Sequence, residues 1–345
     1  MLSSRPVSPL ILGFAGLTLD ARTKALFEQL NPAGYILFRR NCESREQVEA
    51  LCAELTELSS LPTPLIFIDQ EGGRVNRITW EPYMAPSGAK LGEIYAQDPA
   101  RGLKVAELNG YLLGAQLWAY GITVNCLPVA DLQLPGTSNV IGDRAFSADP
   151  AAVGALCGAT ISGLLAGGVW PVIKHAPGHG RALLDSHYEL PRVSADLETL
   201  AADFKPFEMN NIAPFVMTAH VLYEALDDTA CATQSATVIQ DYLRQKLGMT
   251  GVMLADDMFM QALTGSLQQR IQKSLVAGCD LAICGSTSLD GRFSDEYWQQ
   301  LETLTDLPPV SPALLAQLAA LPARGMPQAD TLKEAFEFMQ EVLAV

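Results

Sequence analysis

The feature that most constrains the fold of this chain is a series of eight short apolar segments, each followed by polar residues or glycine. They span residues 9–16, 34–41, 64–73, 122–131, 170–178, 213–221, 251–258 and 280–285. Short runs of β-formers bounded by turn residues are typical of buried parallel strands. Amphipathic segments lie between them, for example at 44–59, 106–121, 149–168 and 235–248. Eight strands alternating with helices predict an α/β fold, a (β/α)8 barrel of the TIM type.

A doubly wound parallel sheet is the alternative architecture for this alternation. No GxGxxG motif opens a first helix, however, and eight units suit the closure of a barrel better. No segment is rich enough in glycine, serine or proline to mark a linker, so we expect a single domain over residues 1–345. From about residue 290 we expect a helical tail, which Pro308, Pro309 and Pro312 interrupt and residues 331–343 close as an amphipathic helix.

Composition limits the compartment and the partners. The formal net charge of −15 opposes binding to nucleic acid or to an anionic membrane surface. No apolar run approaches the ~20 residues of a membrane span, and residues 9–16 fit a first buried strand better than a signal peptide. Seven cysteines, an odd number without a CxxC pair, are typical of reduced thiols. We therefore expect a cytoplasmic monomer without nucleic-acid or membrane partners.

Three of the four histidines fall in one stretch of the sequence, as His175, His179 and His187. Histidine is the side chain whose unperturbed pKa permits proton exchange near neutral pH. Lys174 and Asp185 lie in the same stretch, and its proline and glycines indicate a loop. The sequence therefore predicts that chemistry is concentrated here.

Acids and bases also follow several of the predicted strands. In a barrel these positions meet at the carboxyl ends of the strands, where active sites form. Several such groups at one rim favour an enzyme over a bare scaffold. For Glu71 the favoured interpretation is a strand-end acid that bonds backbone, and for His179 a brace of its loop. His220 fits a pocket-lining residue and a satisfied rim histidine equally well. The residues at the strand ends are Arg39, Asn41, Asp69, Glu71, Asp131, Lys174, His175, His220, Asp256 and Asp257.

Two kinds of chemistry compete at the histidine cluster. Together with Asp185, the three histidines supply potential metal ligands. The HxxxH spacing nevertheless crosses a Pro–Gly loop, not one face of a helix, so we predict neither a metal nor a cofactor.

The favoured alternative is acid–base catalysis with a nucleophile. Asp185 and His187 are two residues apart, so in an extended segment both side chains emerge on one side, and the carboxylate would orient the imidazole as a proton donor. Asp256 follows an apolar strand, a rigid frame for a carboxylate nucleophile. This is the arrangement of a retaining glycosidase, although the donor there is ordinarily Asp or Glu.

Five motifs at these positions resemble the β-N-acetylhexosaminidases of glycoside hydrolase family 3, specifically the single-domain bacterial type used in peptidoglycan recycling. They lie in family order and span roughly residues 9–285. The motifs are ILFRRN at 36–41, DQEGGRVNR at 69–77, GDRAFSADP at 142–150, KHAPGHG with a following DSH at 174–187, and ADDM at 255–258.

The resemblance implies a retaining exo-β-N-acetylglucosaminidase that removes terminal N-acetylglucosamine (GlcNAc) from peptidoglycan fragments. It implies that Asp256 is the nucleophile, His187 the general acid/base and Asp185 its partner. The expected small-molecule substrate is GlcNAc-1,6-anhydro-N-acetylmuramic acid, with or without peptide. The residues implied to bind the sugar are Asp69, Arg77, Arg144, Lys174 and His175.

The chain departs from the family pattern at two positions. Ala176 replaces the usual Phe and Ala255 the usual Ser, which we expect to alter affinity or loop order. Asp257 should point away from the pocket if its strand stays extended. The loop 177–187 holds two glycines, and we expect it to move and carry His187 over bound substrate.

Three alternative functions remain at this point. A phosphorylase would use phosphate in place of water as the acceptor. A non-catalytic sugar-binding barrel would lack the acid–base pair, and a metal-dependent hydrolase would lose activity to chelators. A β-glucosidase is disfavoured, because the Asp–His donor accompanies the N-acetylhexosaminidase branch.

Overall fold

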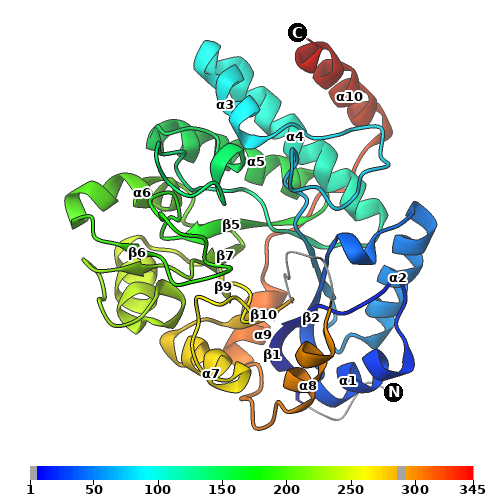
Figure 1. Ribbon diagram of the computed structural model, residues 1–345. Helices are drawn as coiled ribbons and strands as arrows, with labels where there is room; N and C mark the ends of the chain where they lie inside the picture. The colour runs from blue at the N-terminus through cyan, green and yellow to red at the C-terminus, as the bar shows by residue number, and fades with distance from the viewer. Residues whose placement is uncertain (1–5, 286–292, 345) are drawn as a thin grey trace.

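The computed structural model describes residues 6–285 and 293–344, and its centre is a closed barrel of eight parallel strands (Figure 1). Each predicted segment overlaps one strand, so the predicted (β/α)8 barrel is confirmed. The order around the barrel is β1-β10-β9-β7-β5-β4-β3-β2. The strands are β1 (Ser8–Leu12), β2 (Pro32–Leu37), β3 (Leu65–Ile68), β4 (Val124–Asn125), β5 (Trp170–Ala176), β7 (Phe215–Thr218), β9 (Val252–Ala255) and β10 (Leu281–Cys284).

Helices surround the barrel, and the four segments that the sequence predicted as helices form α2, α4, α5 and the π-helical η4. Several begin at a side chain that accepts a backbone N–H, such as Ser44 before α2 and Asp149 before α5. The helices up to β10 are α1 (Ala21–Leu30), α2 (Arg45–Leu58), α3 (Gly88–Gln97), α4 (Pro99–Ala119), α5 (Pro150–Ala166), α6 (Leu197–Met209), η4 (Thr237–Lys246) and α7 (Leu267–Ala277), with 3-10 turns η1 (Arg39–Asn41), η2 (Gly142–Arg144) and η3 (Ala232–Gln234).

The alternation of side chains along the strands divides the core into two parts. One set of alternate residues fills the barrel, where the rings of Phe67 and Phe215 lie 5.7 Å apart. The other set, with Ile66 and Val216, packs against the surrounding helices. Because side chains alternate with a period of two, the residue two places after an inward-facing one points toward the top of the barrel. Phe67, Val172 and Leu254 are inward-facing, and this places Asp69, Lys174 and Asp256 at the top of the barrel.

After β10 the described chain forms three further helices. They are α8 (Asp295–Glu302), α9 (Pro312–Ala319) and α10 (Ala329–Leu343), and α10 confirms the predicted closing helix. Leu314 of α9 belongs to the core inside the barrel, while α10 packs along α4 (Figure 1). A separate pair of two-residue strands, β6 (Arg192–Val193) and β8 (Leu222–Tyr223), was not predicted. In the described part of the chain, no helix has the length and apolar character needed to span a bilayer.

Candidate active site

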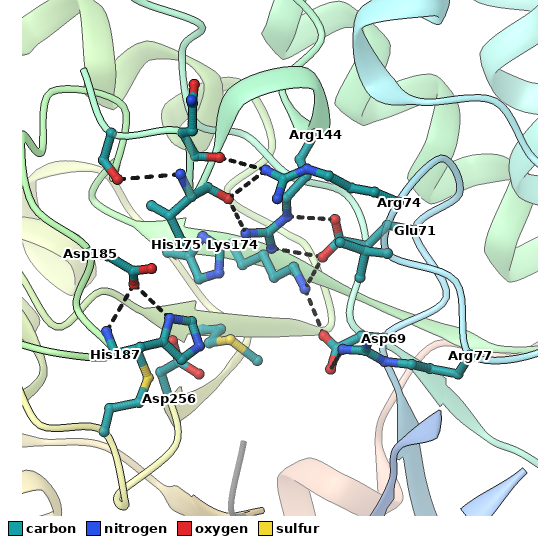
Figure 2. A pocket seen from close by; sticks show the side chains of 16 residues that line it. Asp69, Glu71, Arg74, Arg77, Arg144, Lys174, His175, Asp185, His187 and Asp256 are labelled. Atoms are coloured by element: carbon teal, nitrogen blue, oxygen red, sulfur yellow. Dashed lines mark hydrogen bonds and ion pairs between the residues drawn. The ribbon is translucent and has the colours of Figure 1, made fainter. Parts of the chain in front are cut away.

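A cavity of about 460 Å³ lies at the carboxyl ends of the barrel strands. It collects all eight residues that the sequence and the family resemblance singled out, together with Glu71 and Arg74. Figure 2 shows Asp185 and His187 on one side of this cavity and Asp69 with Arg77 on the other. The eight predicted residues are Asp69, Arg77, Arg144, Lys174, His175, Asp185, His187 and Asp256.

Lys174 lies between two carboxylates at the floor of the cavity. Its Nζ is 2.8 Å from Asp69 Oδ1 and 2.6 Å from Glu71 Oε1, and the residue is 1% exposed. Burial would lower the pKa of Lys174, but the two carboxylates outweigh burial and hold the pKa above its ordinary value. Lys174 is therefore a fixed cation that can donate to a sugar oxygen.

Glu71 joins a second cation to this floor. Arg144 donates from Nε to Glu71 Oε2 and from Nη2 to Oε1, both at 2.8 Å. Burial would raise the pKa of Glu71, but Arg144 and Lys174 outweigh it and hold the carboxyl ionised. The interpretation of Glu71 as an acid that bonds backbone is therefore wrong for its side chain, which binds two cations.

Arg77 continues the same line of charges. Its Nη2 lies 3.7 Å from Asp69 Oδ2, and its buried Nε has no hydrogen-bond partner within the described residues. Arg144, Glu71, Lys174, Asp69 and Arg77 thus alternate in sign across the floor. A row of fixed donors and acceptors suits a ligand with several hydroxyl and carbonyl groups.

Asp131 is a functional residue to which the sequence assigned no role. It is fully buried and accepts two hydrogen bonds, one from His175 Nδ1 at 2.7 Å and one from the backbone N–H of His179 at 2.6 Å. Burial would raise the pKa of Asp131, but His175 outweighs burial and lowers it. Asp131 therefore fixes the ring of His175 at the cavity wall. The one sequence signal for it is its position at the end of the fourth predicted strand.

Asp185 and His187 form the contact that their spacing predicts. His187 Nδ1 lies 2.6 Å from Asp185 Oδ1, and the His187 backbone N–H donates to the same oxygen at 2.9 Å. Because the carboxylate accepts, Nδ1 carries the proton of this bond. Within the described residues Nε2 of His187 makes no hydrogen bond, and the side chain is 27% exposed. His187 lines the cavity, so its Nε2 can exchange a proton with a ligand there.

The loop that carries this pair is held at several points. Arg181 Nε lies 2.6 Å from Asp203 Oδ2 of α6, and the backbone N–H of Gln261 donates to the His187 carbonyl at 3.2 Å. His179 Nε2 lies 3.3 Å from Ser186 Oγ, which confirms His179 as a brace of the loop. Burial lowers the pKa of His179 to about 4, so at neutral pH this imidazole is uncharged.

Asp256 lines the cavity, and Asp257 does not. The Asp257 N–H donates to Asp256 Oδ1 at 2.8 Å, while Asp257 Oδ1 accepts the backbone N–H groups of Phe259 and Gly285, each at 3.1 Å. Burial would raise the pKa of Asp256, but the imidazoles of His220 and His175 and the Asp257 N–H outweigh it, so this pKa lies below its ordinary value. Asp256 is an anion held in a defined orientation.

Two further expectations concern metals and the departures from the family pattern. Within the described residues, no three His, Cys, Asp or Glu side chains are grouped to hold a metal ion. Ala176 and Ala255 are fully buried and belong to the core between strands and helices, so the two departures fall in that core and not in the cavity lining.

Comparison with known proteins decides the family. Residues 12–306 match the model of the "Glycosyl hydrolase family 3 N terminal domain". The chain belongs to glycosyl hydrolase family 3. It is 34% identical to a β-hexosaminidase of Aromatoleum aromaticum, over 99% of this chain and 95% of that protein. It is 37% identical to a β-hexosaminidase of Thiobacillus denitrificans, over 97% and 92% of the two chains.

A solved structure agrees with these relatives. NagZ from Neisseria gonorrhoeae in complex with N-trifluoroacetyl-D-glucosamine superposes with a TM-score of 0.83 at 31% identity, covering 98% of this chain and 97% of that one. The resemblance drawn from the five motifs is thereby confirmed. The chain is a glycoside hydrolase of the β-N-acetylhexosaminidase type.

Proposed function

We propose that this enzyme is a retaining exo-β-N-acetylglucosaminidase that releases terminal GlcNAc from peptidoglycan fragments through a covalent glycosyl-enzyme. The observation that carries the proposal is the Asp185–His187 hydrogen bond of 2.6 Å in the same cavity as the ionised Asp256. The relatives named β-hexosaminidases, and a NagZ complex with a glucosamine derivative, support GlcNAc as the sugar.

In the first step, Asp256 would attack the anomeric carbon while the bond from this carbon to the leaving oxygen breaks. His187, protonated on both ring nitrogens, would give the Nε2 proton to that oxygen, and Asp185 would balance the imidazolium charge before the transfer. In the second step, neutral His187 would take a proton from water, whose oxygen attacks the anomeric carbon and releases Asp256. Two inversions leave the β configuration unchanged.

The floor of the cavity supports exo cleavage of a single terminal sugar. Asp69 and Lys174 stand directly above the packed interior of the barrel, which closes the cavity from below. This closed floor agrees with a site that takes the terminal sugar of a chain. Arg77 and Arg144, which both line the cavity, would donate to hydroxyl or carbonyl oxygens of that sugar.

Separate substitutions of the two reacting side chains test the mechanism. With an aryl N-acetylglucosaminide as substrate, we expect His187→Ala to lower kcat by roughly 10²- to 10⁴-fold. Asp256→Ala should lower it further, because no covalent intermediate forms without the carboxylate. Near-normal turnover by Asp256→Ala would show that the assignment is wrong.

The natural substrate is tested by comparing hydrolysis of GlcNAc-1,6-anhydro-N-acetylmuramic acid, with and without its peptide, with that of chitobiose and aryl glucosides. The proposal requires the anhydro-disaccharide to be preferred. The same assay with and without inorganic phosphate identifies the acceptor, since formation of a sugar 1-phosphate would make the enzyme a phosphorylase.

We also propose that the enzyme works in the cytoplasm. The seven cysteines are all buried and none forms a disulfide, which supports this location.

A further inference from the structure

His220 is a buried imidazole beside the reacting carboxylate that the mechanism does not use. It follows β7, is 1% exposed and is absent from the cavity lining. Its Nε2 lies 3.1 Å from the Asp257 carbonyl oxygen, and its Nδ1 lies 2.8 Å from Thr233 Oγ1 of η3. Of the two interpretations that the sequence left open, a pocket-lining residue and a satisfied rim histidine, the structure selects the second and shows that this histidine is buried.

The partners of the ring determine where its protons are. A carbonyl oxygen only accepts, so Nε2 must carry a proton to bond Asp257. The neutral ring then needs a donor at Nδ1, and the Thr233 hydroxyl supplies it. The Thr233 hydroxyl has a second acceptor within reach, the Ala219 carbonyl oxygen at 3.0 Å, but this carbonyl also accepts the backbone N–H of Thr233 at 3.3 Å and does not depend on the hydroxyl. Thr218 Oγ1 lies 3.0 Å from Thr233 Oγ1 and 3.1 Å from the Leu254 carbonyl oxygen. With the Thr233 proton on His220 Nδ1, both ring nitrogens are satisfied.

The other two states of the ring are disfavoured. With the proton on Nδ1 alone, the lone pair of Nε2 would face the carbonyl oxygen of Asp257. A doubly protonated ring would be a buried cation, and although Asp256 favours that form, burial outweighs it and lowers the pKa of His220. At neutral pH the ring is the uncharged Nε2–H form.

We propose that His220 is a positioning residue, which as a neutral Nε2–H imidazole holds the Asp257 carbonyl and thereby the carboxylate of Asp256. The Asp257 peptide transmits the effect, since its neighbouring N–H is bonded to Asp256 Oδ1 at 2.8 Å. The inference rests on the proposed role of Asp256 as the nucleophile. It adds that the frame of this nucleophile depends on a chain from Thr218 through Thr233 and His220.

An uncharged ring also suits the chemistry. A cation in this position would form an ion pair with Asp256 and stabilise the free carboxylate against attack on the sugar. The neutral form orients the carboxylate through the backbone without compensating its charge. A misplacement of about 1 Å at a reacting group costs roughly 10²-fold in rate, so a loss of this anchor should be visible in kcat.

Two matched substitutions separate positioning from simple space filling. The amide nitrogen of glutamine, a donor, is as many bonds from Cα as Nε2 of histidine, and the amide oxygen of asparagine, an acceptor, is as many as Nδ1. His220→Gln therefore retains a donor for the Asp257 carbonyl, whereas His220→Asn retains the contact with Thr233 alone. We expect His220→Asn to lower kcat by roughly 10- to 100-fold at nearly unchanged KM, and His220→Gln to restore at least about tenfold of that loss.

Equal kcat in the two variants, or a raised KM at unchanged kcat, would overturn the proposal. The midpoint of thermal unfolding is measured for both variants as well, because a purely structural role of His220 would lower stability and activity together in each of them.

A direct measurement on the unaltered enzyme complements the variants. Histidine-selective ¹⁵N NMR at neutral pH, with four histidines to assign, reports the proton positions. We expect one ring protonated at Nε2 alone whose signals disappear in His220→Gln. If the ring of His220 is protonated at Nδ1 alone or at both nitrogens, the proposal is contradicted. If the variants do not fold, a spectrum in which none of the four rings is protonated at Nε2 alone contradicts it as well. An enzyme that is inactive on GlcNAc substrates yet shows this tautomer would refute the proposed function and leave the proton assignment standing.

Discussion

At the residue scale, the floor of the cavity shares one carboxylate between two cations. Glu71 Oε1 is the acceptor for both Lys174 and Arg144, and the Glu71 side chain is 5% exposed. Glu71 therefore compensates part of both buried positive charges, while Asp69 is a second partner of Lys174. All three side chains of the Lys174–Glu71–Arg144 group line the cavity.

Substitution Glu71→Gln tests this sharing. The amide removes the negative charge and places an N–H donor where one carboxylate oxygen accepted, so Arg144 loses its charged partner while Lys174 keeps Asp69. Removing one member of a buried ion pair costs about 3–5 kcal/mol, and we expect the free energy of unfolding in urea to fall by that amount. KM for the aryl glycoside should rise, because Lys174 and Arg144 lose their fixed positions.

The control for Glu71 is Asp143→Asn, which removes the partner of Arg74 in a pair whose side chains are 47% and 48% exposed. An exposed pair contributes about 0–1 kcal/mol, so this variant should be nearly as stable as the parent. If the two variants lose equal stability, the charge shared by Glu71 has no special role.

The sequence predicts a site residue best where its reactive side chain stands directly at the end of a strand. Asp69 and Asp256 were predicted at the rim because each directly follows an apolar strand. In the structure each lies two residues after an inward-facing one, Phe67 or Leu254, and the same period turns Asp257 away. The roles of Glu71 and Asp131 were missed for a physical reason. Their partners are 73 and 44 residues away, and only the closed barrel brings them together.

At the element scale, the segment 177–187 is an ordered loop with one strong anchor. Arg181 reaches the nearly buried carboxylate of Asp203 on α6, whose side chain is 1% exposed. Burial raises the pKa of Asp203, so this carboxylate depends on its partner to remain charged. Gly180 passes so close to the Leu132 carbonyl that any side chain there would collide with it. A motion of residues 177–187 as a whole would have to release the Arg181–Asp203 contact.

Substitution Arg181→Met tests the anchor while keeping the apolar stem. An unpaired buried carboxylate costs roughly 1–3 kcal/mol, so local opening of the loop should become easier by that amount. Hydrogen exchange of the backbone amides in residues 178–189 should accelerate correspondingly, while amides of the barrel strands stay protected.

The matched control lies in β6, shortly after this segment. Arg192 is 3.9 Å from Glu224, with side chains 58% and 41% exposed, and Arg192→Met should leave the exchange of this loop unchanged. Equal acceleration in both variants would mean that Arg181 does not anchor the loop.

Among the elements, the ones that the sequence indicates are those with a long repeating pattern. The helix α2 has such a pattern, and so do the longer strands. The helices α4 and α5 are instead long and apolar on several sides, because they pack against each other as well as the barrel, so the expectation that they are amphipathic is wrong. The two-residue pair β6–β8 has no period to detect, because it forms only where the segment after the loop meets the segment after β7. Tertiary contact, not local propensity, creates that element.

At the scale of the whole molecule, acid should destabilise the enzyme through its buried histidines. The net charge of −15 shrinks as the pH falls, which relieves repulsion among surface carboxylates and by itself favours folding. His179 acts in the opposite direction. Its pKa is about 4 in the folded protein, against about 6.5 for an unperturbed histidine.

Between these two values the unfolded chain binds more protons than the folded one, so the contribution of neutral His179 is complete above about pH 6.5 and is lost as the pH falls toward 4. The loss is on the order of 3 kcal/mol, and the lowered pKa of His220 adds to it in the same direction.

The substitution His179→Gln tests this contribution, because it replaces the ring by an amide that does not titrate. Unfolding in urea at pH 7.5 and at pH 4.5 should therefore show a smaller loss of stability in this variant than in the parent. If parent and variant lose equal stability between the two pH values, the acid sensitivity arises elsewhere, and His179 braces the loop without linking it to pH.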